Sequence, residues 1–245
     1  MNSAVQALLI PLSVLGVGLV MMLFELRNPG RKWPEVSGWY LRAIFLNLLQ
    51  VGTVILSGKA WDGWMLNHRP WNADVLGVTA GAIIGYIATT LVYYWWHRWR
   101  HESDFLWRWF HQVHHSPQRI EVITSFYKHP LEIFVNGILS SAILYLVVGV
   151  GTQAATYAIL ISGLAELVYH WNISTPYWLG FIFQRPESHC VHHEKNKHSS
   201  NYSDLPLWDM LFGTFDNPKA FDRSCGFEDA NEHRLPEMLI GRKIE

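Results

Sequence analysis

The chain has 245 residues, of which 50% are hydrophobic and only 16% are charged, against roughly 25% in soluble domains. The net charge is −1 and the 19 Lys and Arg residues are scattered, so no basic surface for nucleic acid is indicated. The two cysteines form no C-x-x-C pattern, which argues against a disulfide framework.

The first apolar segment, residues 4–26, carries almost no charge and is long enough to cross a bilayer core of about 30 Å. Residues 40–57 form a second candidate span, which could instead be shallow or re-entrant. Residues 75–96 form a third, and its last four residues are aromatic, as is typical of the lipid headgroup interface.

The fourth apolar segment, residues 131–169, is too long for one span. Gly149 and Gly151 near its middle offer a turn, so we expect a helical hairpin. The sequence therefore predicts an all-α integral membrane protein with about four to five transmembrane helices. A helical cap on one side of the membrane would be formed by residues 97–130 and 170–245.

The charges near the span ends predict an orientation. Cytoplasmic loops are enriched in Lys and Arg, and here these residues gather on the side that follows the first and third spans. The opposite side carries only Lys59 and Arg69, balanced by two Asp residues. We therefore expect the N-terminus outside and the cap in the cytoplasm, at the inner membrane if the protein is bacterial.

Eight of the thirteen histidines fall into three tight clusters within the predicted cap. One cluster has the spacing i, i+4 and the other two have the spacing i, i+3, i+4, which share a face of a helix. Each cluster could therefore direct its rings to a common point. Imidazole binds iron, zinc and copper, and eight rings exceed what one such ion takes, so we expect two metals. The predicted ligands are His97, His101, His111, His114, His115, His189, His192 and His193.

The alternative for any single histidine is a hydrogen-bonded polar side chain at the membrane interface. For the whole set this alternative fails, because each buried ring without a partner would cost about 1–3 kcal/mol. His170 directly follows the last apolar segment and is a predicted ninth ligand. Glu166 lies one turn earlier and could be a ligand, a polar group in helix packing, or the acceptor of a hydrogen bond from the second N–H of a ligand ring. We favour the role of hydrogen-bond acceptor.

Four further residues are candidates for supporting the ligands. His129 could be a ligand or a structural histidine at the interface, and His198 a distal ligand or part of a solvated loop. Asp204 and Asp209 could accept from the outer nitrogens of the clusters or could cap helices. Asp209 is the stronger candidate, because it lies in a short apolar segment where an unpaired carboxylate would be costly.

Six motifs occur together between residues 80 and 215. They are H-R-W-R-H at 97–101, H-Q-V-H-H-S at 111–116, K-H-P-L-E at 128–132, H-W-N-I at 170–173, H-C-V-H-H at 189–193 and N-Y-S-D-L-P-L-W-D-M-L-F-G-T-F at 201–215. In this combination the chain resembles bacterial members of the fatty acid hydroxylase/sterol desaturase superfamily.

The resemblance implies a histidine-coordinated di-iron site that uses O2 on a lipid-type substrate, with zinc able to replace iron in recombinant samples. It also implies a separate electron donor such as a ferredoxin, a cytochrome b5-like protein or a reductase. Some members carry a histidine at the position of Glu166, so the number of ligands could be nine or ten.

We expect N-terminal spans and a connecting loop in residues 1–74, the di-iron domain in 75–215 and a polar tail in 216–245. The expected activity is hydroxylation of an unactivated C–H bond in a fatty acyl, sterol or terpenoid substrate. Sterol desaturation and methyl oxidation at the same site are alternatives. A histidine-lined metal transporter is an alternative from a different class.

Overall fold

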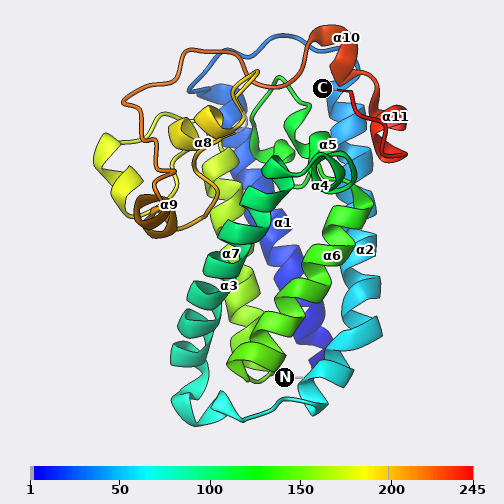
Figure 1. Ribbon diagram of the computed structural model, residues 1–245, viewed down its shortest axis with the longest axis vertical. Helices are drawn as coiled ribbons and strands as arrows, with labels where there is room; N and C mark the ends of the chain where they lie inside the picture. The colour runs from blue at the N-terminus through cyan, green and yellow to red at the C-terminus, as the bar shows by residue number, and fades with distance from the viewer. Residues whose placement is uncertain (1–2, 198, 245) are drawn as a thin grey trace.

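The computed structural model describes residues 3–197 and 199–244, so the predicted role of His198 lies outside the described residues. In the described residues the regular secondary structure is helical, apart from one isolated antiparallel bridge. Long helices form a bundle and short helices cover one end of it (Figure 1). The long elements are α1 (Ser3–Arg27), α2 (Trp39–Asn67), α3 (Gly77–Glu102), α6 (Pro130–Ser141), the π-helical continuation η3 (Ala142–Val148) and α7 (Thr152–His170).

Three stretches of the described chain are long and apolar enough to cross a membrane. They are α2, residues 73–102 and residues 130–148. The all-helical class is therefore confirmed, with three candidate membrane-spanning stretches in the described residues. α2 is one helix that extends beyond the predicted 40–57, which argues against a re-entrant segment. α1 and α7 cover the other predicted crossings and stay predictions as spans.

Small residues allow α3 and α7 to pack closely. A Cβ atom at Gly81 would lie 3.1 Å from the Cβ of Ala154, and one at Gly85 would lie 3.5 Å from the Cβ of Ala158. Such small residues let two membrane helices approach closely enough for extensive van der Waals contact. The close fit of α3 against α7 matters for function because both helices end in predicted ligands.

The predicted hairpin turn is present between η3 and α7. Gly149 adopts a φ of 77°, in the left-handed region that favours glycine, and a Cβ there would lie 2.4 Å from the ring of Trp71. The turn is therefore packed against the segment before α3. That segment contains the short helix η1 (Ala73–Leu76).

The opposite end of the bundle carries the short elements and the C-terminus (Figure 1). They are α4 (Asp104–Phe110), α5 (Gln112–His115), η2 (Val122–Thr124), η4 (Tyr177–Phe181), α8 (Pro186–His192), α9 (Pro206–Phe212), α10 (Asp229–Glu232) and α11 (Leu235–Leu239). Met238 of α11 is fully buried in a core that also contains Trp107 and Val113. The C-terminal residues thus support the helices that carry the second cluster.

Candidate metal centre

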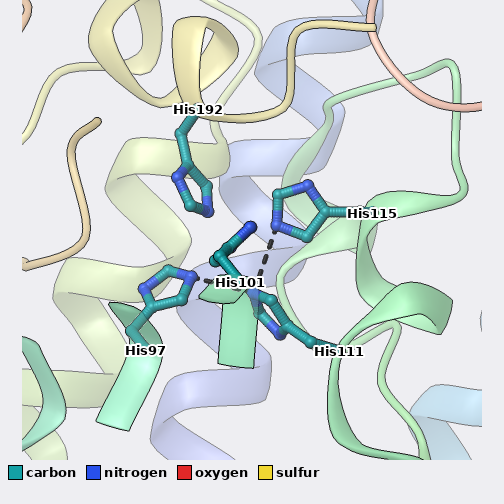
Figure 2. A group of neighbouring side chains, drawn as sticks. All are labelled: His97, His101, His111, His115 and His192. Carbon is teal, nitrogen blue, oxygen red and sulfur yellow. Dashed lines mark hydrogen bonds between the residues drawn. The ribbon is translucent and has the colours of Figure 1, made fainter. Parts of the chain in front are cut away.

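All nine predicted ligands lie in two groups within the cap. In each group one potential ligand atom per residue lies within 4.8 Å of all the others. The first group has five rings, which converge from separate segments of the chain (Figure 2). The five-ring group is His97, His101, His111, His115 and His192, and the four-ring group is His114, His170, His189 and His193.

The ends of α3 and α7 and the short helices deliver these rings. His97 and His101 lie in the last turns of α3, and His170 is the last residue of α7. Ser103 caps α4, with its hydroxyl 3.4 Å from the backbone N–H of Leu106. Pro186 begins α8, because proline needs no N–H partner at the first position of a helix.

The expectation that each H-x-x-H-H motif directs its three rings to one point was wrong. Both motifs send their first and last rings to one group and the middle ring to the other. The first motif gives His114 to the four-ring group, and the second gives His192 to the five-ring group. Successive helical residues are about 100° apart, so adjacent rings diverge, and the reciprocal exchange fills both groups.

Four ligand candidates donate a hydrogen bond from their outer nitrogen, Nδ1, to a backbone carbonyl oxygen. This contact leaves Nε2 as the unprotonated nitrogen that can bind a metal. The Nδ1-to-oxygen distances are 2.7 Å from His97 to Tyr202, 2.8 Å from His192 to Ser200, 2.9 Å from His170 to Glu166 and 3.3 Å from His114 to Tyr127.

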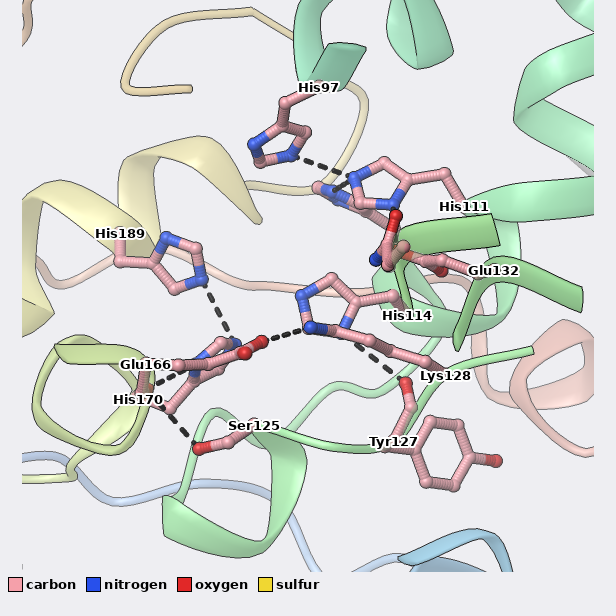
Figure 3. A network of polar contacts seen from close by, with 12 residues as sticks. His97, His111, His114, Ser125, Tyr127, Lys128, Glu132, Glu166, His170 and His189 are labelled. Carbon is pink, nitrogen blue, oxygen red and sulfur yellow. Dashed lines mark hydrogen bonds and ion pairs between the residues drawn. The ribbon is translucent and has the colours of Figure 1, made fainter. Parts of the chain in front are cut away.

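The inner nitrogens are close to one another. Nε2 of His97 lies 2.8 Å from Nε2 of His111, and Nε2 of His170 lies 3.0 Å from Nε2 of His189 (Figure 3). Separations of this size are expected for neighbouring ligands around an ion with metal–nitrogen distances of about 2.0–2.1 Å. The donor set therefore fits a bound transition-metal ion in each group.

Burial keeps the rings in the form that binds metal. Loss of solvent, with a smaller contribution from neighbouring positive groups, lowers the pKa of His111, His114, His115 and His189 well below the usual value. These rings are therefore neutral at physiological pH. A neutral imidazole can bind a metal ion without first losing a proton.

A buried ion pair that sequence reasoning did not identify supports the five-ring group. Arg100 and Glu132 form a salt bridge with exposed fractions of 4% and 0%. Nδ1 of His111 lies 3.1 Å from Nη1 of Arg100 and 3.3 Å from the Glu132 carboxylate, with His111 and Glu132 side by side in Figure 3. If Nε2 binds a metal, Nδ1 carries the proton and only the carboxylate can accept it. Glu132 is the last residue of the K-H-P-L-E motif, and this motif is the sequence feature from which its role could have been predicted. His111 is thus a ligand candidate whose outer nitrogen faces a carboxylate.

Glu166 contacts the four-ring group through its backbone. Its carbonyl oxygen accepts from His170, whereas its carboxylate pairs with Lys128 (Figure 3). The expected acceptor role of the Glu166 side chain is therefore corrected to one of the main chain. Ordinary helical geometry explains this, because the carbonyl lies four residues before the ring that it accepts from.

The other supporting candidates act at a distance from the rings. His129 caps α6, accepting from the N–H of Leu131 at 3.0 Å, and its Nε2 lies 3.1 Å from the carbonyl oxygen of Leu239. Asp209 accepts from the backbone N–H groups of Tyr202 and Ser203 at 2.8 and 3.0 Å. Asp209 thereby holds the carbonyl of Tyr202 in place for the ring of His97.

Asp204 forms a separate polar contact, with the hydroxyl of Tyr169. Burial, reinforced by the nearby Glu166 carboxylate, raises the pKa of Asp204 to about 7. Burial likewise raises the pKa of Asp209 to about 6. Neither carboxylate belongs to the two histidine groups.

A cavity of about 400 Å³ connects the histidines with the interior of the bundle. His97 and His111 of the five-ring group and His114 and His189 of the four-ring group line one end. Apolar side chains line much of the remainder, among them Val51, Val54, Ile55, Ile133 and Ile159. The cavity therefore joins an apolar interior to both candidate metal sites.

The sequence profile of the fatty acid hydroxylase family matches residues 82–214, which include all nine rings. The chain belongs to the fatty acid hydroxylase family. It is 28% identical to an alkylglycerol monooxygenase of Homo sapiens over 164 residues, 64% of this chain and 34% of that protein. It is 32% identical to the ornithine lipid hydroxylase OlsE of Rhizobium tropici over 215 residues, 81% of this chain and 64% of that protein.

A very-long-chain aldehyde decarbonylase of Oryza sativa subsp. indica, GL1-9, is 30% identical over 122 residues, which are 48% of this chain and 47% of that protein. The chain thus spans about a third of the length of the alkylglycerol monooxygenase and less than two thirds of the other two proteins. No solved structure matches the chain.

Proposed function

We propose that this protein is an O2-dependent di-iron oxygenase that hydroxylates an unactivated C–H bond of a lipid-type substrate. The observation that carries the proposal is the junction of two buried histidine groups with a cavity that extends into the apolar bundle. The names of two relatives, a monooxygenase and a lipid hydroxylase, support the same reaction class.

In this proposal the nine rings hold two iron ions. When bound, iron activates O2 for attack on a C–H bond. The residues of the chain bind the ions, orient the ligand rings through carbonyl oxygens and the Glu132 carboxylate, and exclude water. The apolar lining of the cavity, including Val51 and Ile159, would hold the hydrocarbon part of the substrate.

The proposed arrangement in the membrane follows the charge distribution. The N-terminus would be outside, and the metal centre would lie on the cytoplasmic side, at the inner membrane if the protein is bacterial. A separate electron donor would dock on the same side. The candidate donors are a ferredoxin, a cytochrome b5-like protein and a reductase.

Desaturation, methyl oxidation or carbon–carbon cleavage at the same site is the second candidate. The aldehyde decarbonylase relative favours carbon–carbon cleavage among these outcomes. Metal transport fits less well, because it would need ligands at successive depths in the bilayer. In the described residues both histidine groups gather at one end of the bundle.

The test is to supply isotopically labelled O2 to iron-loaded membranes that contain the protein and to analyse their lipids. Hydroxylation predicts one labelled oxygen atom in a lipid product. A product that has lost two hydrogens without gaining label would establish desaturation instead. No lipid change together with metal uptake into vesicles would overturn the proposal in favour of transport.

A further inference from the structure

Two short elements of the cap expose large apolar side chains on one side of the molecule. We call these residues the lateral apolar surface, and they belong to the turn that includes η4 and to α9. The surface consists of Trp178, Ile182, Phe183, Leu207, Met210 and Leu211, and Trp178 and Leu211 are 60% and 62% exposed. Exposed apolar residues gathered in this way mark an interaction site.

The apolar face of α9 points outward. Leu207, Met210 and Leu211 have the spacing i, i+3, i+4, which places side chains on one face of a helix. The inner face is polar at Asp209, which is 1% exposed, and at Trp208, whose indole N–H donates to the Thr90 hydroxyl at 3.0 Å. A helix on a water-facing surface would have the opposite arrangement.

The lateral apolar surface continues the outer surface of α3. The ring of Phe212, the last residue of α9, lies 4.9 Å from the ring of Trp95, and Trp95 lies 6.3 Å from Trp99. Trp99 is 52% exposed. α9 lies beside the upper end of α3 and outside the bundle (Figure 1). The stretch that contains α3 is long and apolar enough to span a membrane.

We propose that the lateral apolar surface inserts into the bilayer, at the boundary between headgroups and acyl chains, in the leaflet that the upper end of α3 reaches. Tryptophan and other aromatic side chains favour this depth. Short amphipathic elements bind such an interface by burying their apolar face. The guanidinium of Arg98 lies 5.6 Å from the centre of the Trp95 ring and pairs with Glu102 at 2.7 Å, which makes this edge of the surface polar.

This insertion would fix the height of the metal centre relative to the membrane. α9 carries Asp209, whose carboxylate holds the backbone of Tyr202, and the Tyr202 carbonyl accepts from His97. Two successive hydrogen bonds therefore join the inserted helix to a ligand candidate. The inference requires that α3 spans the bilayer, but it does not depend on the reaction that the site performs.

The test uses the full chain in phosphatidylcholine vesicles with a single added cysteine that carries an environment-sensitive fluorophore. Cys190 and Cys225 are buried and are not expected to react. Leu211→Cys and Ile182→Cys probe the two halves of the surface independently, so one failed variant leaves the other. Asp222→Cys is the control, because Asp222 is an exposed, charged residue of the segment between α9 and α10 and is not part of the lateral apolar surface.

We expect blue-shifted emission from the labels at 211 and 182, quenching by lipids that carry a spin label near the headgroup, and protection from aqueous iodide. The control label should show the reverse pattern. Iodide quenching at 211 and 182 equal to that of the control would overturn the proposal. Protection that disappears when the protein is diluted at constant lipid would also overturn it, because it would show that a second copy covers the surface.

Discussion

The rings of His115 and His193 stack face to face, with centroids 4.2 Å apart and planes only 16° from parallel, although they belong to different histidine groups. Each is the last residue of an H-x-x-H-H motif. The stack therefore lies where the two groups meet. The stack holds the two candidate metal sites side by side, so a change in the ring positions of one group should alter the ring positions of the other.

Removing one ring from the four-ring group should release metal. His114→Ala takes away one of four ligand candidates, and we expect a loss of about one metal ion per chain, since ions bound in this way rarely tolerate fewer ligands. Metal analysis of the purified protein measures this. His68→Ala is the matched control, because His68 is exposed and outside both groups. Full metal content in His114→Ala would refute the role of His114 as a ligand.

Glu132→Gln should weaken metal binding without removing a ligand. The amide cannot accept from the His111 N–H as strongly as a carboxylate does, and loss of such a contact typically costs about 10–100-fold in metal affinity. A competition titration with a chelator measures the change.

Glu187→Gln is the control for this experiment. Glu187 is also a buried, ion-paired carboxylate, but its partners are Arg31, Arg185 and Thr175, and none of them is a ring of the metal centre. An equal loss of affinity in both variants would show that Glu132 acts only through overall stability.

The metal-free protein should become more stable as the pH rises through the usual range of histidine titration. Burial lowers the pKa of His111, His114, His115 and His189, so the unfolded chain binds more protons than the folded chain below about pH 6.5. Buried carboxyl groups whose pKa values are raised, among them Asp204, Asp209 and Glu232, act in the opposite direction, and we expect the imidazoles to dominate the proton balance.

Thermal unfolding of the metal-free protein in detergent, measured at about pH 5 and about pH 7.5, tests the sign of this dependence. The midpoint should be higher at the higher pH. A midpoint that falls with rising pH would mean that the buried carboxylates, and not the imidazoles, dominate the proton balance.

A bulkier side chain in the cavity should restrict the enzyme to substrates with shorter hydrocarbon chains. Ile159 lines the cavity, so Ile159→Trp would occupy part of it and should shift the products toward shorter chains. Ile161 lies on the same helix but does not line the cavity, which makes Ile161→Trp the matched control. Lipid analysis by mass spectrometry compares the two. Identical product lengths in both variants would place the substrate elsewhere.

The C-terminal helix should be needed for stability of the cap. Met238 is fully buried against the core that contains Val113, one residue before His114. Met238→Ala should therefore destabilise the protein by about 2–5 kcal/mol, as other large-to-small core substitutions do. Ile240→Ala, at a site 70% exposed, should have little effect. Equal unfolding midpoints for the two variants would contradict the observed packing.

The sequence by itself determined the features that depend on local chemistry and spacing. The lengths of the apolar segments indicated membrane helices, and the spacing of the histidines indicated metal binding, because both follow from the rise and turn of a single helix. Glycine at 149 likewise indicated the hairpin turn, since the left-handed conformation there is a property of one residue.

Only the tertiary structure decided how the rings are shared and what holds them. The division of each H-x-x-H-H motif between two groups, the pairing of Glu132 with His111 and the burial of Met238 all join residues that are distant in the sequence. Local periodicity states which faces a helix presents, but not which partner will cover each face. That choice depends on the packing of all the helices together, and it turned three clusters of histidines into two candidate metal sites.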